Sequence, residues 1–185
     1  MKKFYSLSLI VLASLSYAQV SLTALNTAYT QNFDGIANSG TSNSTTLNGT
    51  LAGWYILETG SNSNTTYTVG TGSATTGDTY SFGATSSTER ALGSIASGNL
   101  LSKYGAQFKN DTGNIIDQLE ISYVGEEWRL GDVARATKDQ IVFEYSTDAT
   151  SLTTGTWTEV TALKYETTVI QSGLVGAKDG NNPTF

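Results

Sequence analysis

Two runs of alternating apolar and polar side chains are the strongest structural signal in the sequence. Residues 119–124 have the sequence LEISYV and residues 141–146 have the sequence IVFEYS. Because successive side chains of a β-strand point to opposite faces, each run predicts a strand with one mainly apolar and one mainly polar face. Such strands form antiparallel sheets that are packed on one side and exposed to water on the other.

Shorter apolar or alternating segments that are predicted to form strands or to reach the core recur along the chain between turn signals. They are residues 29–35, 51–58, 66–69, 80–83, 89–95, 103–109, 156–165 and 167–171. Residues 20–30 show no clear period, residues 38–49 form a polar loop and residues 172–185 are predicted to be loop. No segment has sustained helical periodicity with caps at both ends. The pattern predicts an all-β fold of about eight to ten short strands, an antiparallel, jelly-roll-like β-sandwich.

Residues 1–18 have the features of a signal peptide. Lys2 and Lys3 precede an apolar run, and residues 16–18 form a small-x-small cleavage site before Gln19. The run is short for a membrane span, although an uncleaved anchor is the alternative. We therefore expect a secreted or cell-surface protein whose β-sandwich domain is residues 19–185, with no membrane insertion after cleavage.

Composition limits the class of partner and the means of stabilisation. Loss of the two lysines leaves 8 Lys+Arg against 16 Asp+Glu, so the formal charge changes from −6 to −8. This charge disfavours nucleic acid and anionic membranes as partners. With no cysteine, the domain depends on packing alone. The ten Tyr, six Phe and three Trp favour a folded domain over a disordered one.

Six motifs occur in order along the chain: GWY (53–55), YSFG (80–83), TERALGS (88–94), YGAQFKNDTG (104–113), LEISYVGEEWR (119–129) and FEYSTD (143–148). Together they resemble an extracellular β-sandwich module of secreted Bacteroidota proteins, which often carry a C-terminal sorting signal. The resemblance covers nearly all of the chain after the signal peptide. Its motifs are structural, so it implies a fold and export but no catalytic activity.

The resemblance has one departure at the C-terminus. Members of this group continue beyond the position of Asp179, Gly180 and Asn181 into further strands, whereas this sequence stops at Phe185. A sandwich without closing strands would expose sheet edges. The resemblance therefore implies a fragment of a longer multidomain protein that lacks its closing strands; a complete short variant is the alternative.

Carboxylates are the only groups of this chain suited to hydrolytic catalysis. Histidine and cysteine are absent, which excludes Ser-His-Asp and Cys-His arrangements and the usual zinc sites. Glu126 and Glu127 lie beside Trp128 and Arg129, and glycoside hydrolysis needs two carboxyl groups on one site. Adjacent strand residues point apart, so Glu89 would have to supply the partner. No cofactor motif is present.

The alternative role for these residues is structural. Glu89, Arg90, Glu126 and Arg129 are predicted to form ion pairs that order loops near strand ends. Trp128 is predicted to pack in the core, with an exposed platform for sugar rings as the alternative. Calcium binding by loop carboxylates is a further possibility without a spaced motif. Its candidates are Asp111, Asp132, Asp139 and Asp148.

These observations support two hypotheses about function. The first is a non-catalytic extracellular module, bacterial in composition, for adhesion or carbohydrate binding to a glycan or surface protein, or a spacer in a larger secreted protein. The second is a secreted carbohydrate-active hydrolase that uses Glu89 with Glu126 or Glu127. The ligand and the oligomeric state are not encoded in any motif.

Overall fold

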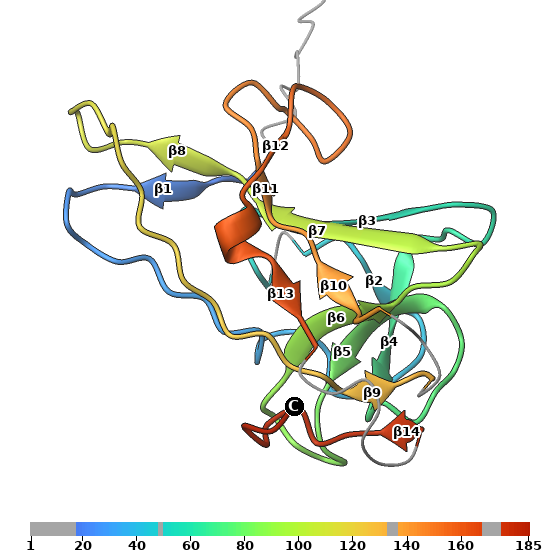
Figure 1. Ribbon diagram of the computed structural model, residues 1–185. Coiled ribbons are helices and arrows are strands. Elements are labelled where there is room, and N and C mark those ends of the chain that lie inside the picture. Colours follow the sequence, from blue (N-terminus) through green and yellow to red (C-terminus); the bar gives the residue numbers. More distant parts are fainter. Residues whose placement is uncertain (1–17, 48–49, 133–136, 168–174) are drawn as a thin grey trace, which may run out of the picture.

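The computed structural model describes residues 18–47, 50–132, 137–167 and 175–185, and within them the chain is all-β (Figure 1). It has no α-helix in these ranges, and one 3-10 turn, η1 (Thr161–Leu163). The described strands are β1 (Val20–Leu22), β2 (Asn43–Ser44), β3 (Trp54–Thr59), β4 (Thr66–Gly70), β5 (Asp78–Phe82), β6 (Ala91–Ile95), β7 (Leu101–Ala106), β8 (Phe108–Asn110), β9 (Arg129–Leu130), β10 (Gln140–Ile141), β11 (Glu144–Tyr145), β12 (Thr158–Glu159), β13 (Tyr165–Glu166) and β14 (Gly176–Ala177). The predicted all-β class is confirmed. The predicted signal peptide lies outside the described residues, except for Ala18.

The central sheet has the order β2-β4-β5-β6 and is mixed. The β2–β4 and β5–β6 pairs are antiparallel, but β4 and β5 run parallel. Entirely antiparallel pairing, as the sequence predicts, is therefore wrong for this pair. The loop at 71–77 returns the chain to the starting end of the sheet. Its Gly72 has φ +79°, and a Cβ there would lie 1.7 Å from the carbonyl oxygen of Trp128, so only glycine fits.

The longest antiparallel ladder joins β3 and β7. It runs from Trp54 opposite Ala106 to Thr59 opposite Leu101, as expected from the apolar segments at 51–58 and 103–109. The predicted second segment is divided at Gln107, where the chain changes partner. The Gln107 amide donates to Gly53 at 2.8 Å, and its carbonyl accepts from Val20 at 2.8 Å. Beyond this residue β8 pairs with β1.

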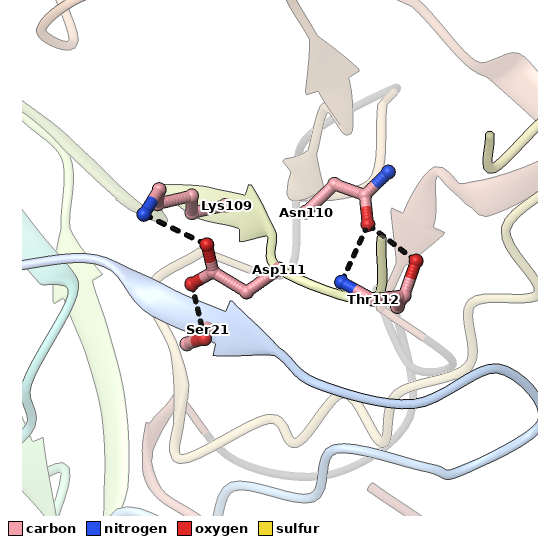
Figure 2. A network of polar contacts seen from close by, with 5 residues as sticks. All are labelled: Ser21, Lys109, Asn110, Asp111 and Thr112. Carbon is pink, nitrogen blue, oxygen red and sulfur yellow. Dashed lines mark hydrogen bonds and ion pairs between the residues drawn. The ribbon is translucent and has the colours of Figure 1, made fainter. Parts of the chain in front are cut away.

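The β1–β8 pair is parallel and forms an arm that extends away from the body, at the upper left of Figure 1. Figure 2 shows the polar contacts that hold it. Asp111 accepts a hydrogen bond from Ser21 and forms an ion pair with Lys109 at 2.7 Å. These two contacts lower the pKa of Asp111. Asn110 caps the following turn by accepting from the Thr112 amide and hydroxyl.

The expected first strand at 29–35 is wrong, and β1 lies where the sequence shows no period. Residues 29–35 are irregular and contribute single side chains to packing. The Tyr29 hydroxyl accepts from the Trp54 indole at 3.0 Å, and Phe33 packs edge-on against the same indole at 4.9 Å. Side-chain contacts of this kind hold aromatic rings together without a backbone ladder, so they leave an apolar signature that resembles a strand.

The largest difference from the sequence prediction concerns residues 119–124. They form no strand within the described chain. Tyr123 is tied down by its side chain, which stacks on Phe143 at 6.2 Å and donates from its hydroxyl to the carbonyl of Leu163. Leu119 remains 58% exposed.

The second alternating run is divided into β10 and β11, which pair with β13 and β12. The interruption coincides with η1 in the opposite segment. The Val160 amide still donates to Phe143 at 2.9 Å, so the two segments remain adjacent across the break. The predicted strand at 156–165 likewise becomes β12, η1 and β13, and the C-terminal region predicted as loop contains β14. Most of the predicted strand at 167–171 lies outside the described residues.

Two apolar clusters form the buried core. One contains Ile36, Leu47, Leu51 and Tyr67. The other contains Tyr80, Phe82 and Trp128 and is extended by Ala91 and Ile95. The second cluster lies beneath the C-terminal segment, next to the candidate site residues Glu89, Arg90, Glu126 and Arg129. Within the described ranges, no helix has the length and apolar character needed to cross a membrane.

Candidate functional site

Arg90 cross-links the central sheet from within. It lies directly before β6 and is 3% exposed. Its Nε donates to the Ser81 hydroxyl at 2.9 Å, and its Nη2 donates to the carbonyls of Ser81 and Gly70. Burial lowers the pKa of Arg90, and the neighbouring Glu89 charge opposes that effect. The guanidinium therefore donates its hydrogen bonds to carbonyls of β4 and β5, and it is buried away from any external ligand.

The structure brings Glu89 and Glu126 together, as the sequence suggested. Glu126 accepts from the Trp128 indole at 2.8 Å, and Glu89 accepts from Asn181 at 2.7 Å. The pKa of Glu126 is raised, first by burial and then by the charges of Glu89 and Asp179, while the indole hydrogen bond lowers it. The two glutamates form one acidic cluster near the C-terminal segment.

Glu127 is buried near Tyr165. Burial raises the pKa of Tyr165 most, and the charges of Glu127 and then Glu126 raise it further. The Tyr165 ring packs over Gly125, where a Cβ would lie 2.2 Å from the ring. Glu127 thus belongs with the aromatic ring of β13.

Trp128 is a core residue, 5% exposed, as its packing role predicts. It stacks on Phe82 with ring centroids 6.2 Å apart and an interplanar angle of 5°. Gly180 covers the other edge, because a Cβ there would lie 2.4 Å from the indole nitrogen. The alternative of an exposed Trp128 platform for sugar rings is therefore wrong in this conformation.

Arg129 secures the C-terminal segment to the loop at 71–77. Its Nη1 donates to the carbonyls of Gly72 at 3.0 Å and Ser73 at 3.3 Å. Its backbone pairs with Ala177 in the β9–β14 ladder. The adjacent Lys178 amide donates to the Trp128 carbonyl at 2.9 Å. These contacts join the C-terminal segment to β9 and to the loop at 71–77.

A second carboxylate pair, which the sequence reasoning missed, lies between strands. Glu58 of β3 is buried and accepts from the Thr79 amide at 2.9 Å and hydroxyl at 2.8 Å, and from the Asn64 amide at 3.0 Å. The Thr79 hydroxyl also reaches Ser102 of β7 at 2.8 Å. Asp78 lies beside this group and shares a hydrogen bond with Glu58. The sequence signal that could have revealed this buried pair is Thr79, a polar residue beside the buried Tyr80 in β5.

Asp78 offers a test of this buried group by pH. Its pKa is raised, chiefly by burial and also by Glu58, while the Thr68 hydrogen bond lowers it. The folded state therefore holds its proton to higher pH than the unfolded state, and stability from this group falls as pH rises through the folded pKa. Asp78→Asn should increase the free energy of unfolding at pH 7 by about 1 kcal/mol. Urea unfolding should show that this gain shrinks as the pH falls through the raised folded pKa and is absent below the ordinary pKa of 3.8; an unchanged difference between pH 7 and pH 3 would contradict the prediction.

An open groove of about 290 Å³ lies between residues 121–125 and 162–165. Its aromatic walls are Tyr123 and Tyr165, and Lys164 at its rim is paired with Glu166 at 2.7 Å. The buried Tyr165 hydroxyl has no hydrogen-bond partner among the described residues. A smaller groove of about 180 Å³ is lined by residues 21–24 and 27–29.

The loop carboxylates considered for calcium are dispersed. Asp111 serves the β1–β8 arm, and Asp148 accepts from Ser146 and from the Thr156 amide, which lowers its pKa. In the part of the chain that is described, no three acidic, histidine or cysteine side chains come close enough to hold a metal ion.

Comparison with known proteins does not narrow the function. No protein-family model, no curated protein and no solved structure matches this chain. The resemblance to exported sandwich modules remains a prediction from its motifs, and the function must be inferred from the geometry of the folded chain.

Proposed function

We propose that this protein is a non-catalytic, exported module that binds a glycan or a surface protein at the cell surface. The observation that supports this role best is the engagement of its charged side chains by the protein itself. Glu89 is bonded to Asn181, Arg90 to Ser81, Glu126 to Trp128 and Arg129 to Gly72. Groups held in this way order the chain, whereas a catalytic pair must be open to its substrate.

We further propose a β-sandwich architecture, with jelly-roll-like connections. Two layers are supported by the hydrogen bonds that run from Thr79 in the central sheet to Glu58 and Ser102 in the β3–β7 ladder. Figure 1 shows that ladder lying across the end of β5 and β6. The Ser-, Thr- and Asn-rich loops between strands then provide contact groups on a rigid scaffold, as loops commonly do.

Binding to immobilised ligands tests this role directly. The purified protein should be retained by at least one class of polysaccharide or extracellular surface protein on an array, without releasing soluble sugar. Retention by no ligand class would contradict a binding module and leave the role of spacer. Release of reducing sugar would support the second candidate.

The second candidate, a glycoside hydrolase, is favoured by the raised pKa of Glu126 beside Glu89. Two neighbouring carboxyl groups, one of them with a raised pKa, are the arrangement of a general acid and its partner. For the binding module, Glu126→Gln and Glu89→Gln should each leave ligand retention unchanged within about twofold, because the amides keep an acceptor oxygen. For an enzyme, either substitution should reduce turnover by at least about a hundredfold. Reducing-sugar assays of wild type and both variants separate the two.

A further inference from the structure

Residues 115–126 have a backbone that is open to a partner strand. The structure records no backbone hydrogen bond between this segment and any other described residue. In Figure 1 the segment runs as an extended trace from the tip of the β1–β8 arm down to β9. An extended chain with unpaired amides and carbonyls is the template that strand addition uses.

The side chains of the same segment form an exposed apolar ribbon. Ile115 is 90% exposed, Val124 is 85% exposed, and Leu119 and Ile121 are also exposed. Tyr123 anchors the ribbon through Phe143 and the Leu163 carbonyl, so the segment is held against the body at one point. The groove of about 290 Å³ begins beside Ile121 and Tyr123. Alternate side chains of an added strand would therefore meet the exposed apolar ribbon and this groove.

The charge of this region indicates the sign of the charge that a partner should carry. Between Lys109 and Arg129 the chain has five carboxylates and no lysine or arginine. Asp117 and Glu120 lie on the exposed ribbon itself. A second copy of this chain would bring like charge against like charge, since the protein carries a formal charge of −6. A cationic strand is complementary.

We propose that residues 115–124 dock an extended, basic segment of another protein by strand addition. Backbone hydrogen bonds provide affinity, apolar side chains of the partner cover the ribbon and the groove, and lysine or arginine side chains lie near Asp117 and Glu120. The inference rests on the proposed role as a binding module and names the chemistry of its partner.

Fluorescence anisotropy with two labelled, capped heptapeptides tests the site. One alternates lysine with valine and the other alternates glutamate with valine. The lysine peptide should bind and the glutamate peptide should not, and the affinity should fall with added salt. Ser122→Pro removes a central amide donor and should weaken binding at least about tenfold, whereas Ser122→Ala should stay within about twofold. Hydrogen exchange should show that the peptide protects amides within 115–124.

Two controls keep the test decisive. The Ser122 amide has no described backbone partner, so the thermal midpoint of Ser122→Pro should match wild type. If Ser122→Pro unfolds, exposed Asp117→Lys and Glu120→Lys replace it and should each weaken binding several-fold.

The inference is overturned by three results. The first is that the lysine peptide does not bind, and the second is that all variants bind it equally. The third is that the protein associates with itself and Ser122→Pro abolishes this association, which would mean that the ribbon binds a second copy of the chain. Glycan binding without peptide binding would overturn this inference and leave the proposed function intact.

Discussion

Glu58→Ala is expected to lower the free energy of unfolding by about 3 kcal/mol. The carboxylate accepts from the Thr79 amide, the Thr79 hydroxyl and the Asn64 amide in the interior. Alanine cannot replace these acceptors, so the buried Thr79 hydroxyl loses its carboxylate partner and the Thr79 amide keeps only its hydrogen bond to Asp78. The same substitution removes the hydrogen bonds that join Glu58 of β3 to Thr79 of β5. Urea unfolding at pH 7, followed by far-ultraviolet circular dichroism, measures the loss.

Two further variants isolate the cause. Glu58→Gln keeps one acceptor oxygen and should lose clearly less than Glu58→Ala. Ser102→Ala removes only the outer hydrogen bond to Thr79 and should lose about 1 kcal/mol. If all three variants lost the same free energy, the network would not be the source of the stability.

Trp128→Ala should destabilise the fold by about 3–5 kcal/mol, the range for truncation of a buried aromatic side chain. The indole stacks on Phe82, donates to Glu126 and lies under Gly180. Its loss leaves a cavity beneath the C-terminal segment and removes the donor that stabilises the Glu126 carboxylate. Thermal and urea unfolding should both show the change, and hydrogen exchange should show faster opening of β14 than of β3.

Trp128→Phe is the matched control, since it keeps an aromatic ring against Phe82 but loses the indole donor. We expect a smaller loss, about 1–2 kcal/mol. A loss for Trp128→Phe as large as that for Trp128→Ala would mean that the hydrogen bond to Glu126, rather than packing, holds the segment. Unchanged exchange in β14 after Trp128→Ala would mean that the indole does not hold the C-terminal segment in place.

The alternating runs were a good guide to where strands lie when a partner strand met them along their length. The segments at 51–58 and 66–69 became β3 and β4 because β7 and β2 pair with them. At 119–124 the same alternation produced no strand, because Tyr123 is held through its side chain and no described strand lies alongside. Periodicity reports which face is apolar, and it does not report whether a ladder forms.

The candidate site shows a similar division. The sequence identified Glu89, Arg90, Glu126 and Arg129 as charged residues near strand ends and predicted ion pairs among them. Their described contacts are instead hydrogen bonds to Asn181, Ser81, Trp128 and Gly72. Glu58 was missed because it ends an apolar run and had the character of an exposed terminal residue. Its burial follows only from the position of Thr79 on another strand.

The sequence by itself determined that this chain is rich in short strands and, without cysteine, has no disulfide framework. Alternation and turn residues act locally, so they can be recognised without knowing the fold. Only the tertiary structure decided that β4 and β5 run parallel, that β1 pairs with β8, and that Trp128 lies beneath Gly180. These features depend on contacts between residues far apart in the chain, and their energies arise only once several segments have packed together.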